Sequence, residues 1–245
     1  MIPLRDNIPT SRRPVVTYAL IAANILVYFL WQKGGIAPGP DDTHYQCQLL
    51  EWSAVPYELT HNQQLEIPQQ CGPDDASIYA TPFTAMFMHG GLLHLGGNML
   101  FLWIFGNNVE DSMGPVKFVV FYVLGGLAAT ALHVITGPSS EVPTLGASGA
   151  IAAVLGGYLI LFPRAKVVTV IFIVFFFTIL ELPALLVLGL WFLQQAVFAY
   201  FDLTGAEGGV AYFAHIGGFV FGLLAIKLFA SRKRVQRQTP PFARS

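Results

Sequence analysis

The sequence predicts an all-α membrane protein in which six helices cross the bilayer. Of its 245 residues, 54% are hydrophobic and only 11% are charged, and the mean hydropathy is +0.59. Soluble domains carry roughly a quarter charged residues, so this composition excludes an ordinary globular protein. The net charge of −1 gives no sign of a nucleic-acid partner.

Six apolar stretches are candidates for the crossings. Along the chain they are 15–31, 82–105, 116–135, 148–162, 183–201 and 210–230. The first is interpreted as an uncleaved signal anchor, because it ends without a clear small-residue cleavage site. The apolar run 167–201 exceeds the roughly 20 residues of one upright crossing, and Glu181 and Pro183 divide it. We therefore expect 167–180 to be an interfacial or re-entrant piece.

The placement of lysine and arginine predicts the orientation. If both termini are cytoplasmic, only Lys33 among the basic residues near the spans lies outside. Residues 1–14 then form a cytoplasmic N-terminal segment, 15–230 the six-span domain and 231–245 a basic cytoplasmic tail. The expected location is a bacterial plasma membrane.

Three loops are expected on the outer side of the membrane: 32–81, 136–145 and the Gly-rich 202–209. The first contains both cysteines of the chain, Cys47 and Cys71. An even number of cysteines in an exoplasmic loop favours a disulfide, and the alternative is two unrelated free thiols.

A serine and a histidine in apolar segments are the candidate catalytic residues. Ser148 follows Gly146-Ala147 at the start of the fourth span, and His215 lies near the start of the sixth. Helix rise against a core of ~30 Å places both about 7 Å below the outer surface. A hydroxyl nucleophile needs a base within hydrogen-bond reach, and a histidine can supply it.

Small residues on the fourth and sixth spans predict that these helices approach closely. The two stripes are Ser148, Ala152 and Gly156, and Ala214, Gly218 and Gly222. The alternative is that these glycines only pack and that Ser148 is an ordinary N-cap. No aspartate lies at the depth of His215, so the pattern favours a Ser–His dyad over a triad.

The second span contains three further polar candidates. His94 and Asn98 are four residues apart and share a helix face, where they suit an oxyanion hole together with the Ser148 backbone N–H. His89, five residues before His94, should point away from it on a helix, which argues against a zinc pair and for a structural role. Alternatively, His94 and Asn98 only form hydrogen bonds with neighbouring helices and have no catalytic role. Glu110, after this span, is expected in a cytoplasmic turn with a capping role.

These motifs resemble those of the rhomboid family of intramembrane serine proteases. The resemblance runs from residue 15 to about 229 and rests on four motifs in order: His94 and Asn98 for H-x-x-x-N, Glu110 and Gly114 for E-x-x-x-G, Gly146 to Gly149 for G-x-S-G, and Ala214 to Gly222 for A-H-x-x-G-x-x-x-G. It implies nucleophile Ser148, base His215, and oxyanion donors His94, Asn98 and the Ser148 backbone. His89, Gly146, Gly149, Gly218 and Gly222 would be structural near the site.

The resemblance also implies which substrates and partners the protein has. Membrane-anchored proteins would be cut near the outer end of a transmembrane helix, with the lipid bilayer as the other partner and with no metal or organic cofactor. Two positions depart from the pattern: Ala152 stands where many relatives have a tyrosine that stacks on the histidine, and Trp52-Ser53 where many have Trp-Arg. The alternatives are a non-catalytic relative that binds or escorts membrane proteins, and a small transporter or channel.

Overall fold

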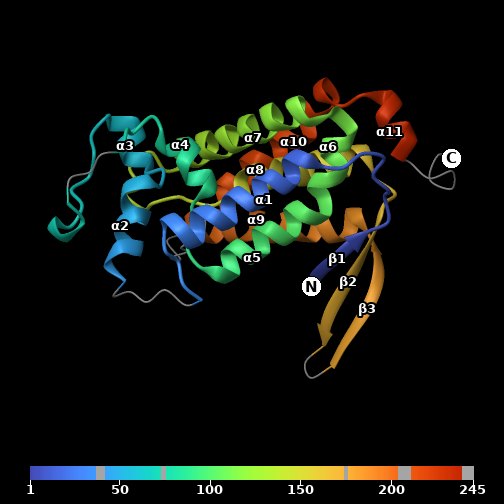
Figure 1. The fold of residues 1–245 in the computed structure, drawn as a ribbon, viewed down its shortest axis with the longest axis horizontal. Helices are drawn as coiled ribbons and strands as arrows, with labels where there is room; N and C mark the ends of the chain where they lie inside the picture. The colour runs from blue at the N-terminus through green and yellow to red at the C-terminus, as the bar shows by residue number, and fades with distance from the viewer. Residues whose placement is uncertain (37–41, 73–75, 174–175, 204–210, 239–245) are drawn as a thin grey trace.

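The apolar stretches form a bundle of helices that lie side by side along one direction (Figure 1). The computed structural model describes residues 1–36, 42–72, 76–173, 176–203 and 211–238. Within this part of the chain, three helices are long and apolar enough to cross a membrane: α7 (Pro115–Thr136), α9 (Ala184–Leu203) and α10 (Tyr212–Phe229). The mostly helical, membrane-type fold is therefore confirmed, whereas helix length alone does not establish six crossings.

Two further apolar helices are shorter. One is α1 (Val15–Leu26), which continues as a π-helical segment, Val27–Trp31. The other is α8 (Ser148–Leu161), whose residues from Gly149 to Tyr158 are all buried. It occupies the centre of the bundle, with α7 and α10 packed along it. Because neighbouring helices enclose it, α8 buries most of its 14 residues inside the bundle.

The second predicted span, 82–105, begins and ends later than expected. Thr81–Thr84 (α4) and a 3₁₀ turn precede an extended segment with the Gly90-Gly91 pair, and glycine is a poor helix former. The long helical stretch then consists of α5 (Leu92–Phe101), the π-helical Leu102–Gly106 and α6 (Asn107–Met113).

Glu110 consequently lies in α6 and not in a turn. Its carboxylate accepts hydrogen bonds from the backbone N–H groups of Val16 (3.0 Å) and Thr17 (2.7 Å) at the start of α1. These are donors that a helix N-terminus leaves unsatisfied. The expected capping role is present, but the helix that Glu110 caps is α1.

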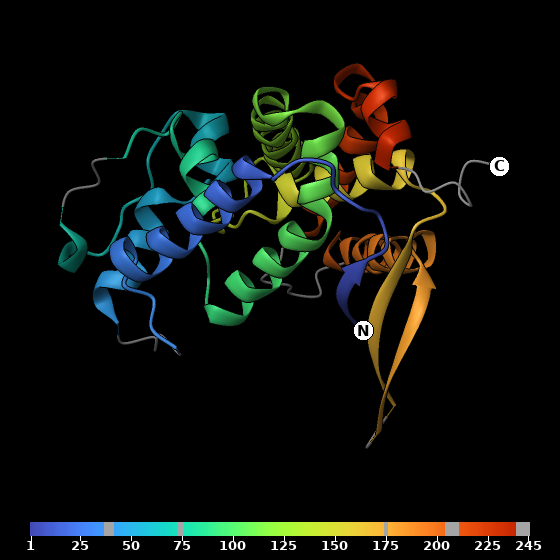
Figure 2. The ribbon, with the colours of Figure 1, turned by 45° about the vertical axis from the view of Figure 1, so that its right-hand side comes forward.

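The expectation of a purely helical chain is wrong at two segments. Strands β1 (Ile2–Asp6), β2 (Lys166–Ile173) and β3 (Phe176–Pro183) form an antiparallel sheet in the order β1-β2-β3. The segment 167–180, expected as an interfacial or re-entrant piece, is thus most of a β-hairpin, which projects away from the helices in both views (Figures 1 and 2). Its run of valine, isoleucine and threonine favours strand over helix.

The sheet is anchored to the bundle through Asp6. Its Oδ2 accepts hydrogen bonds from Asn108 Nδ2 of α6 and from the Tyr158 hydroxyl of α8, both 2.5 Å long. Burial outweighs these bonds and raises the pKa of Asp6 from 3.8 to about 6.

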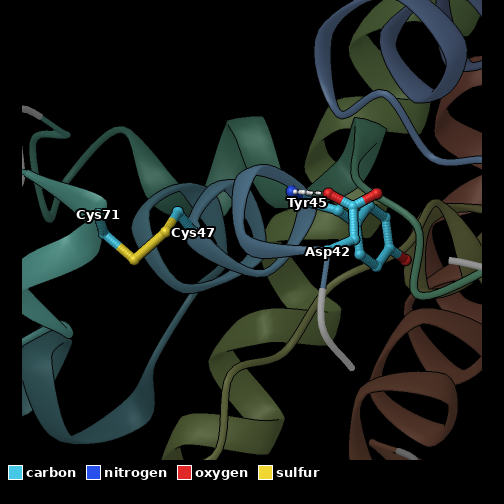
Figure 3. Close-up of a disulfide and its surroundings, with 4 residues drawn as sticks. All are labelled: Asp42, Tyr45, Cys47 and Cys71. Atoms are coloured by element: carbon cyan, nitrogen blue, oxygen red, sulfur yellow. Dashed lines mark hydrogen bonds between the residues drawn. A yellow bond between two sulfur atoms is a disulfide. The ribbon is translucent and has the colours of Figure 1, made fainter. Parts of the chain in front are cut away.

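The predicted loop 32–81 contains short helices. These are α2 (Thr43–Trp52), α3 (Pro56–His61) and a 3₁₀ turn, Gln69–Cys71. Cys47 of α2 and Cys71 form a disulfide (Figure 3). Asp42 caps α2 by accepting the Tyr45 N–H at 3.1 Å, and burial raises the pKa of Tyr45 to about 12.

Part of the chain's last third is outside the description. The predicted basic tail begins with α11 (Arg232–Gln238), and its remainder, 239–245, lies outside the described residues. So does most of the predicted Gly-rich loop, 202–209.

Candidate active site

Ser148 lies at the first residue of α8, immediately after a tight turn. Gly146 of this turn has φ +119°, a conformation that side-chain-bearing residues rarely adopt, and its N–H donates to the Ala85 carbonyl at 2.8 Å. Thr144, just before it, exchanges two backbone hydrogen bonds with Ala54, of 2.8 and 3.0 Å. The candidate nucleophile therefore follows a turn that is held by backbone hydrogen bonds to two other segments of the chain.

His215 is brought to Ser148 by the close approach of α10 to α8. A Cβ at Gly218 would collide with the carbonyl oxygen of Gly149, and a Cβ at Gly222 with that of Ala153. The predicted small-residue stripe on α10 therefore packs closely on α8, where it meets Gly149 and Ala153 as well as Ala152 of the predicted α8 stripe.

The two candidate catalytic side chains are in contact. Ser148 Oγ and His215 Nε2 lie 2.8 Å apart, within the range required between a nucleophile and its base. The other ring nitrogen, His215 Nδ1, lies 2.7 Å from the Oε1 atom of Gln195. The ring also contacts Trp191, with ring centroids 5.8 Å apart. Both of these residues come from α9.

Sequence reasoning missed the contribution of α9. Ala152 is fully buried against α10 and offers no ring to His215, so the orientation of this histidine depends on a different helix. One signal was available: Gln194 and Gln195 are adjacent amides inside the long apolar stretch of α9 that ends before Asp202. A polar side chain at such a position needs a partner, and Gln195 has one in His215.

His94 and Asn98 lie on the same face of α5 and line the cavity that Ser148 and His215 also line. This cavity measures about 640 Å³. The backbone N–H of Gly90 donates to His94 Nδ1 at 3.3 Å, so in the neutral ring Nε2 carries the proton. That side of the ring faces the turn before Ser148, since a Cβ at Gly146 would lie 2.8 Å from His94 Nε2.

Asn98 contributes a second donor. Its side chain is 7% exposed, and its Nδ2 atom has no hydrogen-bond partner among the described residues. Leaving a buried amide donor unpaired is costly, which is typical of a group that meets a ligand atom. His133 of α7 lines the same cavity.

His89 does not point away from His94, as a continuous helix would require. It precedes α5, and its ring contacts that of His94 edge to face, with centroids 5.2 Å apart. The backbone of His89 is held by Gln32, with two hydrogen bonds of 3.0 Å, and by the Tyr45 hydroxyl at 2.8 Å. Its position therefore agrees with a structural role, in which the loop 32–81 supports His94 through His89.

The chain is similar in sequence to a known family of proteins. Residues 78–232 match the Rhomboid domain. Rhomboid protein 1, mitochondrial, of Saccharomyces cerevisiae is 32% identical over 229 residues, which cover 91% of this chain and 56% of that protein. The presenilin-associated rhomboid-like protein, mitochondrial, of Homo sapiens is 26% identical over 223 residues, which cover 89% and 48%. The chain thus spans about half the length of these relatives.

These relatives contradict the expectation of a bacterial plasma membrane. The yeast, bovine and human proteins that match most of the chain are all named as mitochondrial, and they point to a mitochondrial membrane instead. Lysine and arginine placement reports only which side of a membrane a loop occupies, so the sequence pattern could not distinguish one membrane from another.

Proposed function

Because the chain belongs to the rhomboid family, we propose that it is an intramembrane serine endopeptidase that cleaves the transmembrane segments of membrane proteins. The observation that carries this proposal is the 2.8 Å contact between Ser148 Oγ and His215 Nε2 at the wall of a cavity. A packing serine would not need a histidine within hydrogen-bond reach on a second membrane helix.

In the proposed reaction, Ser148 Oγ attacks the carbonyl carbon of the substrate peptide bond while His215 Nε2 takes its proton. The tetrahedral intermediate collapses, the C–N bond breaks, and His215 returns the proton to the leaving amine. A water molecule then attacks the acyl-enzyme while His215 accepts its proton. The ester C–O bond breaks, His215 gives this proton to Ser148 Oγ, and the new carboxyl end leaves.

Negative charge on the intermediate would be stabilised by His94 Nε2–H, Asn98 Nδ2–H and the Ser148 backbone N–H. The first two are neutral donors on one face of α5, and both residues line the same cavity as the nucleophile. Donors fixed in advance act strongly in a water-poor site, because they need no reorganisation when charge develops.

We also propose that the bundle crosses the membrane six times. The crossings would be α1 with its π-helical extension, α5 to α6, α7, α8, α9 and α10, with both termini on the same side. Topology reporters fused after Gln32 and Gly137 should then report one side, and those after Arg164 and the C-terminus the other. A C-terminal reporter on the side of Gln32 would contradict this arrangement.

The activity is tested with purified protein reconstituted in liposomes and a fluorogenic substrate with a single transmembrane helix and small residues near its outer end. Wild type should cleave it, Ser148→Ala should not, and a fluorophosphonate should label only proteins that retain Ser148. Ser77→Ala is the matched control, because Ser77 is exposed in a loop and does not line the cavity.

The same experiment separates a protease from a non-catalytic escort protein. If wild type and Ser148→Ala bind the substrate equally, and neither cleaves it nor reacts with the fluorophosphonate, the endopeptidase proposal is wrong. Cleavage by purified Ser148→Ala at the wild-type rate would also exclude Ser148 as the nucleophile.

A further inference from the structure

His215 is held at both ring nitrogens, and only one of the two partners belongs to the proposed catalytic pair. Nε2 faces Ser148 Oγ at 2.8 Å, and Nδ1 faces Gln195 Oε1 at 2.7 Å. The second distance is as short as a strong neutral hydrogen bond, and it joins α10 to α9.

An amide oxygen can only accept a hydrogen bond, so the proton of a neutral His215 must lie on Nδ1. In that tautomer Nε2 has a free lone pair, as a base needs in order to take the Ser148 proton. The opposite tautomer would direct an N–H toward Ser148 and leave no acceptor there. The identity of the group at Nδ1 therefore determines whether His215 can act as a base.

The surroundings of Gln195 show that its amide is directed inward. Its side chain is 7% exposed, whereas that of the adjacent Gln194 is exposed. Trp191 lies one turn earlier on the same face of α9 and contacts the His215 ring. The imidazole is thus held by an amide at its edge and by an indole beside it, while Ala152 of α8 supplies no contacting ring.

We propose that Gln195 is a positioning residue for His215, whose amide oxygen fixes the Nδ1–H tautomer and the ring orientation needed for proton transfer from Ser148. The proposal rests on the proposed endopeptidase function. Gln195 would take the place that an aspartate occupies in a Ser–His–Asp triad. Its amide is neutral, so it avoids the desolvation cost of burying a carboxylate. His215 can then act as a base only when α9 is positioned so that Gln195 reaches its Nδ1 atom.

The test uses the whole 245-residue chain and two readouts. The first is the rate at which a fluorophosphonate labels Ser148 in wild type, Gln195→Met, Gln195→Glu and Gln194→Met. Methionine keeps the length of glutamine but removes the acceptor, so the labelling rate of Gln195→Met should fall about tenfold, as loss of one neutral hydrogen bond implies. Gln195→Glu keeps an acceptor oxygen and should remain within about threefold of wild type, and the control Gln194→Met should be unchanged.

The second readout is ¹⁵N NMR of histidine-labelled protein, with the His215 signals assigned by their loss in His215→Asn. Wild type should show a protonated Nδ1 and an unprotonated Nε2, and Gln195→Met a mixture of tautomers. This measurement on wild type does not depend on whether the methionine variant folds well.

The outcomes distinguish the two proposals. Wild type that is not labelled at all would overturn the endopeptidase function, and this role with it. Labelled wild type together with unchanged labelling of Gln195→Met would overturn only the role of Gln195. A wild-type His215 protonated at Nε2 would do the same, because the Gln195 amide would then present its nitrogen to Nδ1.

Discussion

Replacing Gly218 by alanine tests whether the close approach of α8 and α10 sets the distance between Ser148 and His215. The added Cβ would collide with the carbonyl oxygen of Gly149 and lie 3.3 Å from the Cβ of Ala152. The Gly149 carbonyl belongs to the backbone of α8, so it cannot move away by a rotamer change as a flexible side chain can. The two helices must therefore separate, by roughly 1 Å, to restore van der Waals contact.

This separation acts directly on the proposed reacting atoms. Gly218 lies one turn after His215, and the 2.8 Å contact between Ser148 Oγ and His215 Nε2 would stretch to nearly 4 Å, beyond hydrogen-bond reach. A misplacement of about 1 Å can cost ~10²-fold in rate, and overpacking costs about 1–3 kcal/mol of stability. We expect a ~10²-fold slower fluorophosphonate labelling of Ser148 in protein that still folds.

The assay compares labelling rate and thermal unfolding in detergent for wild type, Gly218→Ala and Gly189→Ala. Gly189, on α9, has no atom within 4 Å of an added Cβ, so its alanine variant controls for the change in residue type. If Gly218→Ala reacts as fast as wild type, the tight contact between the helices does not set the catalytic distance.

Three other predictions follow from the described contacts. Asn98→Ala and His94→Ala should each lower the cleavage rate ~10²-fold with little change in unfolding temperature, and wild-type rates in both would place the oxyanion hole elsewhere. Replacing Cys47 and Cys71 by alanine should lower the free energy of unfolding by about 3 kcal/mol from loop entropy, with labelling of Ser148 largely retained; equal unfolding midpoints would contradict it. The folded-state pKa of Asp6, about 6, lies above its ordinary 3.8, so wild type should lose up to about 3 kcal/mol of stability as pH rises through this interval. Asp6→Asn should lack this loss, and identical unfolding-versus-pH curves would contradict the assignment.

Much of the bundle and the main contact of the candidate site could be predicted from local patterns. Apolar length predicted the membrane helices, and the rarity of serine and histidine inside such helices singled out Ser148 and His215. Spacing was informative because a helix has a fixed rise and period: it predicted the equal depth of these two residues and the shared face of His94 and Asn98. The structure brings all four to one cavity.

Other features depended on contacts between distant segments. An apolar run such as 167–180 suits several structures. Its strand form depends on pairing between β2 and β3 and on pairing with β1 from the N-terminus. His89 was misplaced because a helix was assumed to continue through Gly90-Gly91.

The sequence by itself determined which polar groups the apolar helices carry and at what position along each helix, because composition and helix rise are local properties. Only the tertiary structure decided which groups meet across helices. Sequence alone does not distinguish Gln195 from the adjacent Gln194 in the apolar part of α9. The rotation of α9 about its axis is set by packing against its neighbours, among them α10. That rotation directs Gln195 toward His215 and leaves Gln194 exposed.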